Sequence, residues 1–118
     1  MSKPNPVVDK SFEFAILVVN ICKSINQDQR EYVLSKQLLR SGTAIGALIR
    51  ESQNGESRKD FIHKLSIAQK ECDESLYWLD LLFETDYLSQ SEYLELKTKC
   101  TELLKLVKSI IISTRNNS

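Results

Sequence analysis

Residues 60–83 read DFIHKLSIAQKECDESLYWLDLLF, and their apolar positions recur at spacings of three and four. Such spacing places the apolar side chains on one face of an α-helix. The face expected to enter a core contains Phe61, Leu65, Ala68, Cys72, Leu76, Leu79 and Phe83. The stretch therefore predicts one long amphipathic helix.

Helical periodicity continues on both sides of this stretch, and turn signals divide the chain into four segments. The predicted helices span residues 9–25, 31–53, 57–84 and 89–114. Asp9 is the expected N-cap of the first helix, and Asn54-Gly55 should end the second in a left-handed conformation. The tetrapeptides SRKD and SQSE, which open the third and fourth helices, resemble capping boxes.

The connections between these segments are short, so helices adjacent in sequence should pack antiparallel. The other three expected core faces are, in chain order, Val8, Phe12, Ala15, Val19 and Cys22; Leu34, Leu38, Ser41, Ile45, Leu48 and Ser52; and Leu96, Cys100, Leu103, Val107 and Ile110. We therefore predict an all-α fold, an up-down-up-down antiparallel four-helix bundle in which residues 1–118 form a single domain.

The composition agrees with a helical protein. Hydrophobic residues make up 42% of the 118 residues, with 3 Gly and 2 Pro, which is too apolar for disorder and too poor in turn formers for an all-β fold. Sixteen basic residues balance sixteen acidic ones, so no net field attracts the whole molecule to nucleic acid or an anionic membrane. The N-terminal residues lack a signal core and no apolar run approaches the roughly 20 residues of a membrane span, which predicts a cytoplasmic protein.

The residue combinations of common metal sites are missing. Cys22, Cys72 and Cys100 lie far apart within apolar stripes, and the single His63 forms only an Asp60-x-x-His63 pair. A structural zinc site needs about four converging ligands, and a di-iron bundle needs paired Glu-x-x-His motifs. We therefore expect no metal or other cofactor, and reduced cysteines in the core.

One group of charged residues resembles an acid–base cluster. It consists of Arg40, Glu51, Lys70, Glu71 and Glu74. A lattice of ion pairs beside an apolar seam is the favoured interpretation, because catalysis would also need a pocket. We therefore predict that the protein is not an enzyme.

More apolar surface is present than one bundle needs. The first helix also carries Phe14, Leu17, Val18, Ile21 and Ile25, and the third carries a second row on its other side. Broad core faces that wrap around each helix are one explanation. Self-association is the favoured one, because Trp and Tyr flanked by charged residues are typical of an interface. The predicted oligomer interface contains Gly42, Gly46, Ile67, Glu71, Glu74, Tyr77, Trp78 and Leu81.

Gly42 and Gly46 share one face in the middle of the second helix. Each glycine costs about 0.5–1 kcal/mol relative to alanine within a helix, so a packing reason is expected. Together with Leu39 and Ile49 they would form a shallow groove for another helix. Ordinary packing inside the bundle is the alternative.

Charge is distributed unevenly along the expected bundle. Antiparallel order brings the start of the first helix, the end of the second, the start of the third and the end of the fourth to one pole, where basic residues outnumber acidic ones. The predicted nucleic-acid-binding residues at this pole are Arg50, Arg58, Lys59, Lys64, Lys105, Lys108 and Arg115. Solvated surface charge without a phosphate partner is the alternative.

Two segments, LLRSGTAIGA (38–47) and DFIHKLSIAQKE (60–71), resemble a bacterial four-helix-bundle family named for proteins encoded in 23S rRNA intervening sequences. Glu74, Tyr77-Trp78-Leu79 and Leu81-Leu82 extend the likeness. The resemblance implies a homopentameric barrel and carries over no catalytic residue. A related accessory protein of diversity-generating retroelements binds nucleic acid through a basic surface, which implies RNA or a ribonucleoprotein as a partner here.

These observations favour a homo-oligomeric binding or scaffold protein whose basic pole meets RNA or a ribonucleoprotein. The alternative is an adaptor that binds only proteins. Salt dependence distinguishes the two, because phosphate contacts weaken steeply with added salt while an apolar docking surface responds little.

Overall fold

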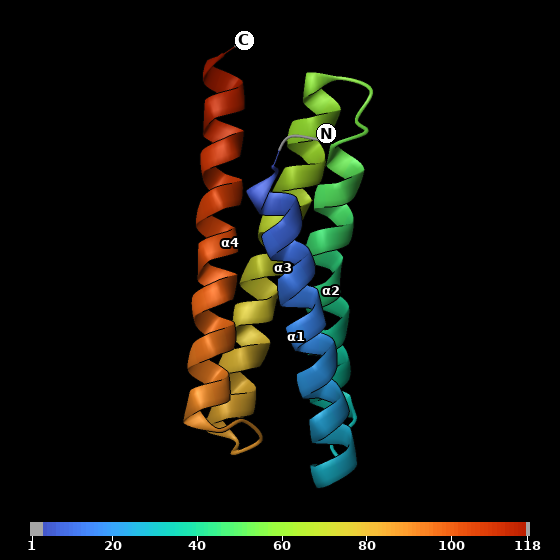
Figure 1. Ribbon diagram of the computed structural model, residues 1–118, viewed down its shortest axis with the longest axis vertical. Coiled ribbons are helices and arrows are strands. Elements are labelled where there is room, and N and C mark those ends of the chain that lie inside the picture. The colour runs from blue at the N-terminus through green and yellow to red at the C-terminus, as the bar shows by residue number, and fades with distance from the viewer. Residues whose placement is uncertain (1–3, 118) are drawn as a thin grey trace.

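The computed structural model describes residues 4–117 and contains four α-helices within them. They are α1 (Pro6–Gln29), α2 (Val33–Ser52), α3 (Arg58–Glu84) and α4 (Gln90–Asn116). The helices alternate in direction, so that the N-terminal end of α1, the α2–α3 connection and the end of α4 lie at the same pole (Figure 1). The predicted all-α class is confirmed, and the order of helix directions is the predicted one.

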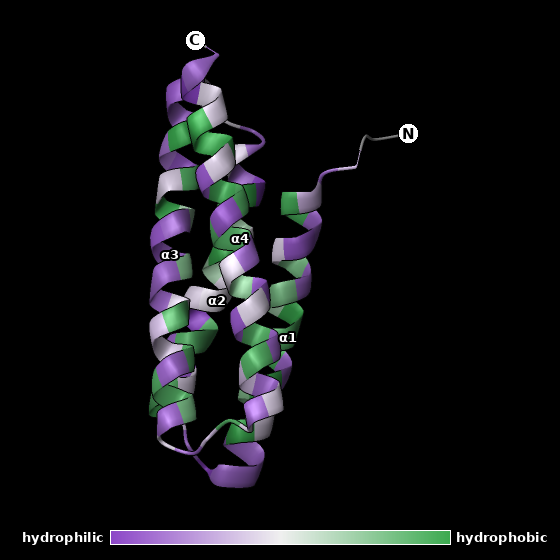
Figure 2. Ribbon diagram, turned by 90° about the vertical axis from the view of Figure 1, so that its left-hand side faces the viewer, coloured by the Kyte–Doolittle hydropathy of each residue, from purple (hydrophilic) through white to green (hydrophobic). Residues whose placement is uncertain are grey.

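Each helix packs against its neighbours in sequence, and α1 closes the bundle against α4. Hydrophobic and hydrophilic residues alternate along every helix, as expected of amphipathic helices around a shared core (Figure 2). The bundle is 48 Å long, several times the Debye length of about 8 Å at physiological salt. The charges at one pole therefore act almost independently of those at the other.

Local capping explains where α1, α3 and α4 begin. The Ser57 hydroxyl accepts a hydrogen bond from the backbone N–H of Asp60 at 3.0 Å, as the sequence predicts. Ser89 and Glu92 form a reciprocal capping box at the start of α4. The prediction of Asp9 as the first N-cap is wrong, because Asn5 caps α1 and Pro6 occupies its first turn.

The predicted end of α2 is also wrong in conformation. The helix ends at Ser52, and Gln53 remains right-handed. Backbone bonds from Gln53, Asn54 and Gly55 to residues three positions earlier tighten this end, and none of the described glycines has a positive φ. A left-handed C-cap occurs instead after α1, at Arg30 (φ 52°).

Glu31 caps α2 from two residues before its first turn. Its carboxylate accepts backbone N–H bonds from Val33 at 3.0 Å and from Leu34 and Ser35 at 2.8 Å. Partial burial raises the pKa of this carboxyl, but the backbone bonds outweigh that effect, and the pKa lies below its ordinary value of 4.5. The ionised form is therefore favoured in the folded protein.

We expect Glu31→Gln to lower the free energy of unfolding at pH 7 by about 1 kcal/mol, as loss of a helix cap does. A pKa lowered by folding stabilises the protein above about pH 4.5, and this contribution disappears as the pH falls through the folded-state pKa. The stability difference between wild type and Glu31→Gln should therefore shrink on acidification. Urea unfolding at several pH values measures it, with the exposed Glu56→Gln as control; a constant difference would contradict the capping role.

The core face of α1 differs from the predicted one. Phe14, Val18 and Ile25, expected as surplus apolar residues, are almost completely buried, whereas Phe12 is 52% exposed. Cys22 alone of the predicted α1 face is fully buried, and Val8, Ala15 and Val19 are only partly covered. On α4, Ile111 replaces the predicted Ile110 in the core, and on α3 Leu82 and Ser75 replace Phe83 and Leu76.

The remaining core predictions are confirmed except at Leu34, Leu48 and Phe61, which are only partly buried, while Ile49 of α2 is completely buried. Leu38, Ser41 and Ile45 of α2 are buried, as are the three cysteines, which are free thiols. The Ser75 hydroxyl donates to the Ser41 hydroxyl at 2.9 Å, joining α3 to α2 inside the core. Within residues 4–117, no buried side-chain nitrogen or oxygen lacks a hydrogen-bond partner.

The two helical glycines bring α2 close to α1. A Cβ atom at Gly42 would lie 2.9 Å from both γ-methyl carbons of Val18, and one at Gly46 would lie 3.3 Å from the carbonyl oxygen of Ser11. Gly42 is buried within its own bundle, so its assignment to the oligomer interface is corrected in favour of ordinary bundle packing. Gly46 serves the same contact but remains partly exposed.

Candidate functional site

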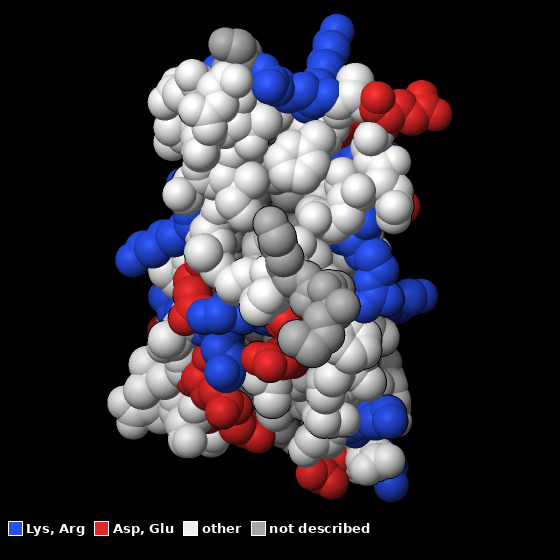
Figure 3. All heavy atoms as spheres, turned by 45° about the horizontal axis from the view of Figure 1, so that its top comes forward, with Lys and Arg blue, Asp and Glu red and all other residues white. Residues whose placement is uncertain are grey.

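The seven predicted nucleic-acid-binding residues lie on α2, α3 and α4, toward the pole where α2 ends and α3 begins. All are exposed except Lys64, which is partly buried. Figure 3 views this pole obliquely and shows Lys and Arg in several separate places, with Asp and Glu between them. The structure therefore divides the predicted cluster into smaller groups rather than one continuous patch.

One group lies where α3 begins beside the last turn of α4. Arg58, Lys59 and Arg115 line a surface hollow of about 490 Å³, together with Ile62. Arg58 and Lys59 take no part in any salt bridge among residues 4–117. This group comes closest to the convergence that the sequence predicts. We call Arg58, Lys59 and Arg115 the polar-end group.

The remaining basic residues lie apart from the polar-end group. Lys105 and Lys108 line a second hollow, of about 670 Å³, on the outer face of α4. Lys64 pairs with Glu51 at 3.8 Å. The Arg50 guanidinium lies 5.3 Å from the centre of the Phe12 ring, a cation–π distance.

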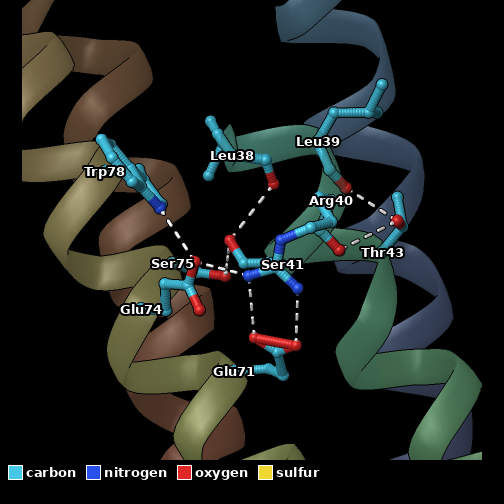
Figure 4. A network of polar contacts seen from close by, with 9 residues as sticks. All are labelled: Leu38, Leu39, Arg40, Ser41, Thr43, Glu71, Glu74, Ser75 and Trp78. Atoms are coloured by element: carbon cyan, nitrogen blue, oxygen red, sulfur yellow. Dashed lines mark hydrogen bonds and ion pairs between the residues drawn. The ribbon is translucent and has the colours of Figure 1, made fainter. Parts of the chain in front are cut away.

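The predicted interface row on α3 lies beside α2 and is tied to it by Arg40 (Figure 4). The Arg40 guanidinium donates two hydrogen bonds to the Glu71 carboxylate, at 2.9 and 3.2 Å, and a third to Glu74. The indole N–H of Trp78 donates to the same Glu74 oxygen at 3.3 Å. Arg40, Glu71 and Glu74 thus form the predicted ion-pair lattice, whereas Glu51 pairs with Lys64 instead and Lys70 forms no salt bridge within residues 4–117.

The electrostatics of this lattice follow from its geometry. Hydrogen bonding from Arg40 is the largest influence on Glu74 and lowers the pKa of its carboxyl below the ordinary value. Half of the Arg40 side chain is exposed, so each ion pair contributes about 1 kcal/mol or less. The bidentate geometry fixes the relative position of α2 and α3 more than it stabilises them.

The apolar members of the row are incompletely covered. Ile67, Trp78 and Leu81 are partly buried, and Tyr77 is 58% exposed. The Tyr77 and Trp78 rings meet edge to face, with centroids 5.0 Å apart. The row therefore presents a partly exposed aromatic pair on α3, next to Glu74 and toward the C-terminal end of the helix. We call Ile67, Tyr77, Trp78 and Leu81 the α3 row.

A cluster between α3 and α4 was missed at the level of sequence. The Tyr93 hydroxyl donates to Asp80 at 2.5 Å, Lys97 donates to Asp80 at 3.0 Å, and the Tyr93 ring stacks on Phe83 with centroids 4.2 Å apart. The i, i+4 spacing of Tyr93 and Lys97 was its only signal. Its role is to clamp the two helices together near their shared connection.

Within residues 4–117, no three His, Cys, Asp or Glu side chains are grouped so that they could hold a metal ion. No helix in this part of the chain is both long and apolar enough to cross a membrane.

Burial raises the pKa of the Cys22 thiol to about 11, and the nearby Glu31 carboxylate adds to the rise.

Fold and surface together define an all-α four-helix bundle with a polar-end basic group and a partly exposed aromatic row. The chain belongs to the 23S rRNA-intervening sequence protein family, whose model matches residues 3–109. The resemblance seen in the sequence is thereby confirmed.

A solved structure supports the same assignment. The chain is similar to a Bacteroides thetaiotaomicron protein of unknown function from the S23 ribosomal protein family, with 51% sequence identity and a TM-score of 0.88. The match covers 89% of this chain and 97% of that one. Among curated proteins, none matches this chain.

Proposed function

We propose that the protein is a non-enzymatic, cytoplasmic, homo-oligomeric scaffold that binds RNA or a ribonucleoprotein through its basic pole. The assembly proposed is a homopentameric barrel, as the family resemblance implies. A purely protein-binding adaptor is the alternative. The observation that carries the proposal is the polar-end group, where exposed cationic side chains from two helices line one hollow.

Several features support phosphate as the partner of this hollow. Arg58 and Lys59 form no salt bridge with another described residue, so their charge is available to an external anion. The start of α3 adds the partial positive charge of a helix N-terminus. A ring of subunits with a common direction would repeat this group in every copy and so multiply the counterions released on binding.

The α3 row supports self-association. An exposed tyrosine packed edge to face on a half-covered tryptophan, with an ion-pair lattice beside it, has the composition of an interface core with a polar rim. The lattice would set the register of a partner without dominating its affinity, since exposed ion pairs contribute little.

The chemistry of the side chains supports a role outside catalysis. Cys22, Cys72 and Cys100 are buried, and buried structural cysteines are unreactive. His63 is exposed and lines neither the hollow of the polar-end group nor the hollow of Lys105 and Lys108. The hollows offer binding surfaces rather than an enclosed site that excludes water.

We expect Arg58→Glu combined with Lys59→Glu to lower RNA affinity at least about tenfold at low salt, because charge reversal removes the interactions of these side chains with phosphates. The slope of log affinity against log salt should become shallower by about one for each phosphate that the variant no longer binds. Fluorescence anisotropy across a salt series measures both, after the mass of the assembly has been shown to be unchanged.

Lys23→Gln, which neutralises one charge at the opposite pole, is the control. Equal weakening by Lys23→Gln would show that binding does not depend on the basic pole. If the unmutated protein binds no RNA at low salt, the adaptor function replaces the proposed one.

A further inference from the structure

A groove runs between α1 and α2 toward the basic pole and has a volume of about 480 Å³. Its walls are mostly apolar, and its polar residues gather at the end where α2 terminates. Among the residues that line it are Val8, Phe12, Thr43, Gly46, Arg50 and Asn54. The groove shares three of the features described above, namely the contact between Arg50 and Phe12, the ion pair of Glu51 with Lys64, and the close approach at Gly46.

The groove results from the close approach of α1 and α2. Gly46 lies against the backbone of Ser11. Because Gly46 has no side chain, nothing projects from this position into the groove. The Phe12 side chain is 52% exposed rather than packed in the core. The Arg50 guanidinium lies 5.3 Å from the centre of that ring, which holds a flat cationic group beside a flat apolar one.

We propose that this groove binds an unpaired nucleobase of single-stranded RNA. The inference rests on the proposed function and specifies how the same pole recognises its partner. Aromatic rings and arginine planes are the groups on which unpaired bases stack, since every base has a π-face. Phe12 and Arg50 provide both, while the polar-end group attracts the phosphate backbone.

The polar residues at the mouth suit the edge of a base. Asn54 carries an amide that can both donate and accept. Glu51 pairs with Lys64 through Oε2 at 3.8 Å, and its other carboxylate oxygen can accept from a ring or exocyclic N–H group. A base in a duplex already pairs this edge and stacks on its neighbours. The groove therefore fits single-stranded RNA rather than a double helix.

The same features favour a base over a second copy of the chain. An interface between copies is depleted of acidic residues, whereas Glu51 lines this groove. The Arg50 guanidinium also complements an anionic ligand. Occupation by a second copy is an outcome that the experiment distinguishes.

The experiment measures the affinity of the full chain for three labelled ligands at low salt. They are a single-stranded RNA of about twelve nucleotides, within the usual site size, a duplex of the same sequence, and an abasic strand of the same length. We expect Phe12→Ala to weaken binding of the single strand by about five- to a hundredfold, the effect of removing one stacked aromatic ring. Affinity for the abasic strand should not change, and Phe12→Trp should preserve binding of the single strand.

Ile16→Ala is the matched control, because Ile16 is a 45% exposed apolar residue one turn along α1 that does not line the groove. It should leave all three affinities unchanged. If Phe12→Ala affects the single strand and the abasic strand equally, or neither, the groove inference is overturned while the basic-pole function stands. A changed assembly mass for Phe12→Ala would assign the groove to a second copy, and a wild type that binds no RNA would overturn both.

Discussion

Gly42→Ala should destabilise the bundle by about 1–3 kcal/mol, the usual cost of overpacking a core. The expected direction is opposite to helix propensity, which favours alanine over glycine by about 1 kcal/mol. The new methyl group would lie 2.9 Å from both γ-methyl carbons of Val18. Val18 is completely buried and β-branched, so it has no alternative rotamer that moves both methyls away.

Chemical denaturation tests this prediction, with a lowered midpoint and an unchanged slope as the expected result. Val18→Ala removes the two methyls, so Gly42→Ala should cost much less in that background, and a double-mutant cycle measures the coupling. Ala47→Gly, at an exposed position of the same helix, reports the propensity effect alone. A raised melting temperature for Gly42→Ala would show that α1 and α2 do not approach as closely as described.

Helix number, type and approximate length could be predicted from the sequence because they depend on local signals. Ser57 and Ser89 cap helices through hydrogen bonds from residues three positions later. A single tetrapeptide is therefore enough to predict where each of these helices begins. The cap of α2 was harder to recognise, because Glu31 lies two residues before the helix begins and binds the backbone N–H groups of Leu34 and Ser35 within it.

The buried face of α1 could not be predicted in this way. The helix carries two apolar rows, one containing Phe12 and the other containing Phe14, and periodicity alone does not choose between them. Which row is buried depends on contacts with α2. Gly42 leaves room for the Val18 side chain, and Gly46 leaves room for the Ser11 backbone. Such a contact between two different helices cannot be recognised from a pattern read along one helix.

The candidate site was partly predictable for a similar reason. Antiparallel order is enough to bring Arg58 and Arg115 to the same pole. Whether each charged side chain forms an ion pair depends on the three-dimensional positions of the side chains. Lys64 pairs with Glu51, and Arg40 pairs with Glu71. The groove beside Phe12 was missed because that ring was expected in the core.

Tyr77→Glu and Trp78→Glu should each convert the proposed assembly into monomers. Burying a carboxylate at the centre of an interface carries a desolvation penalty of several kcal/mol, which exceeds what a single row of side chains can offset. Glu71 and Glu74 lie on the same side of α3 as Trp78 (Figure 4) and would add like-charge repulsion there. Mass measurement in solution at micromolar concentration gives the result directly.

Two variants are needed because Trp78 also packs against the core and donates to Glu74, so its loss affects the fold as well. Tyr77 is 58% exposed, and its replacement should leave the melting temperature of the isolated bundle nearly unchanged. Leu94→Glu places the same charge on an exposed apolar position of α4 and should leave the mass unaltered. A wild-type chain that is monomeric at micromolar concentration would refute self-association, and dissociation by Leu94→Glu rather than Tyr77→Glu would move the interface from the α3 row to α4.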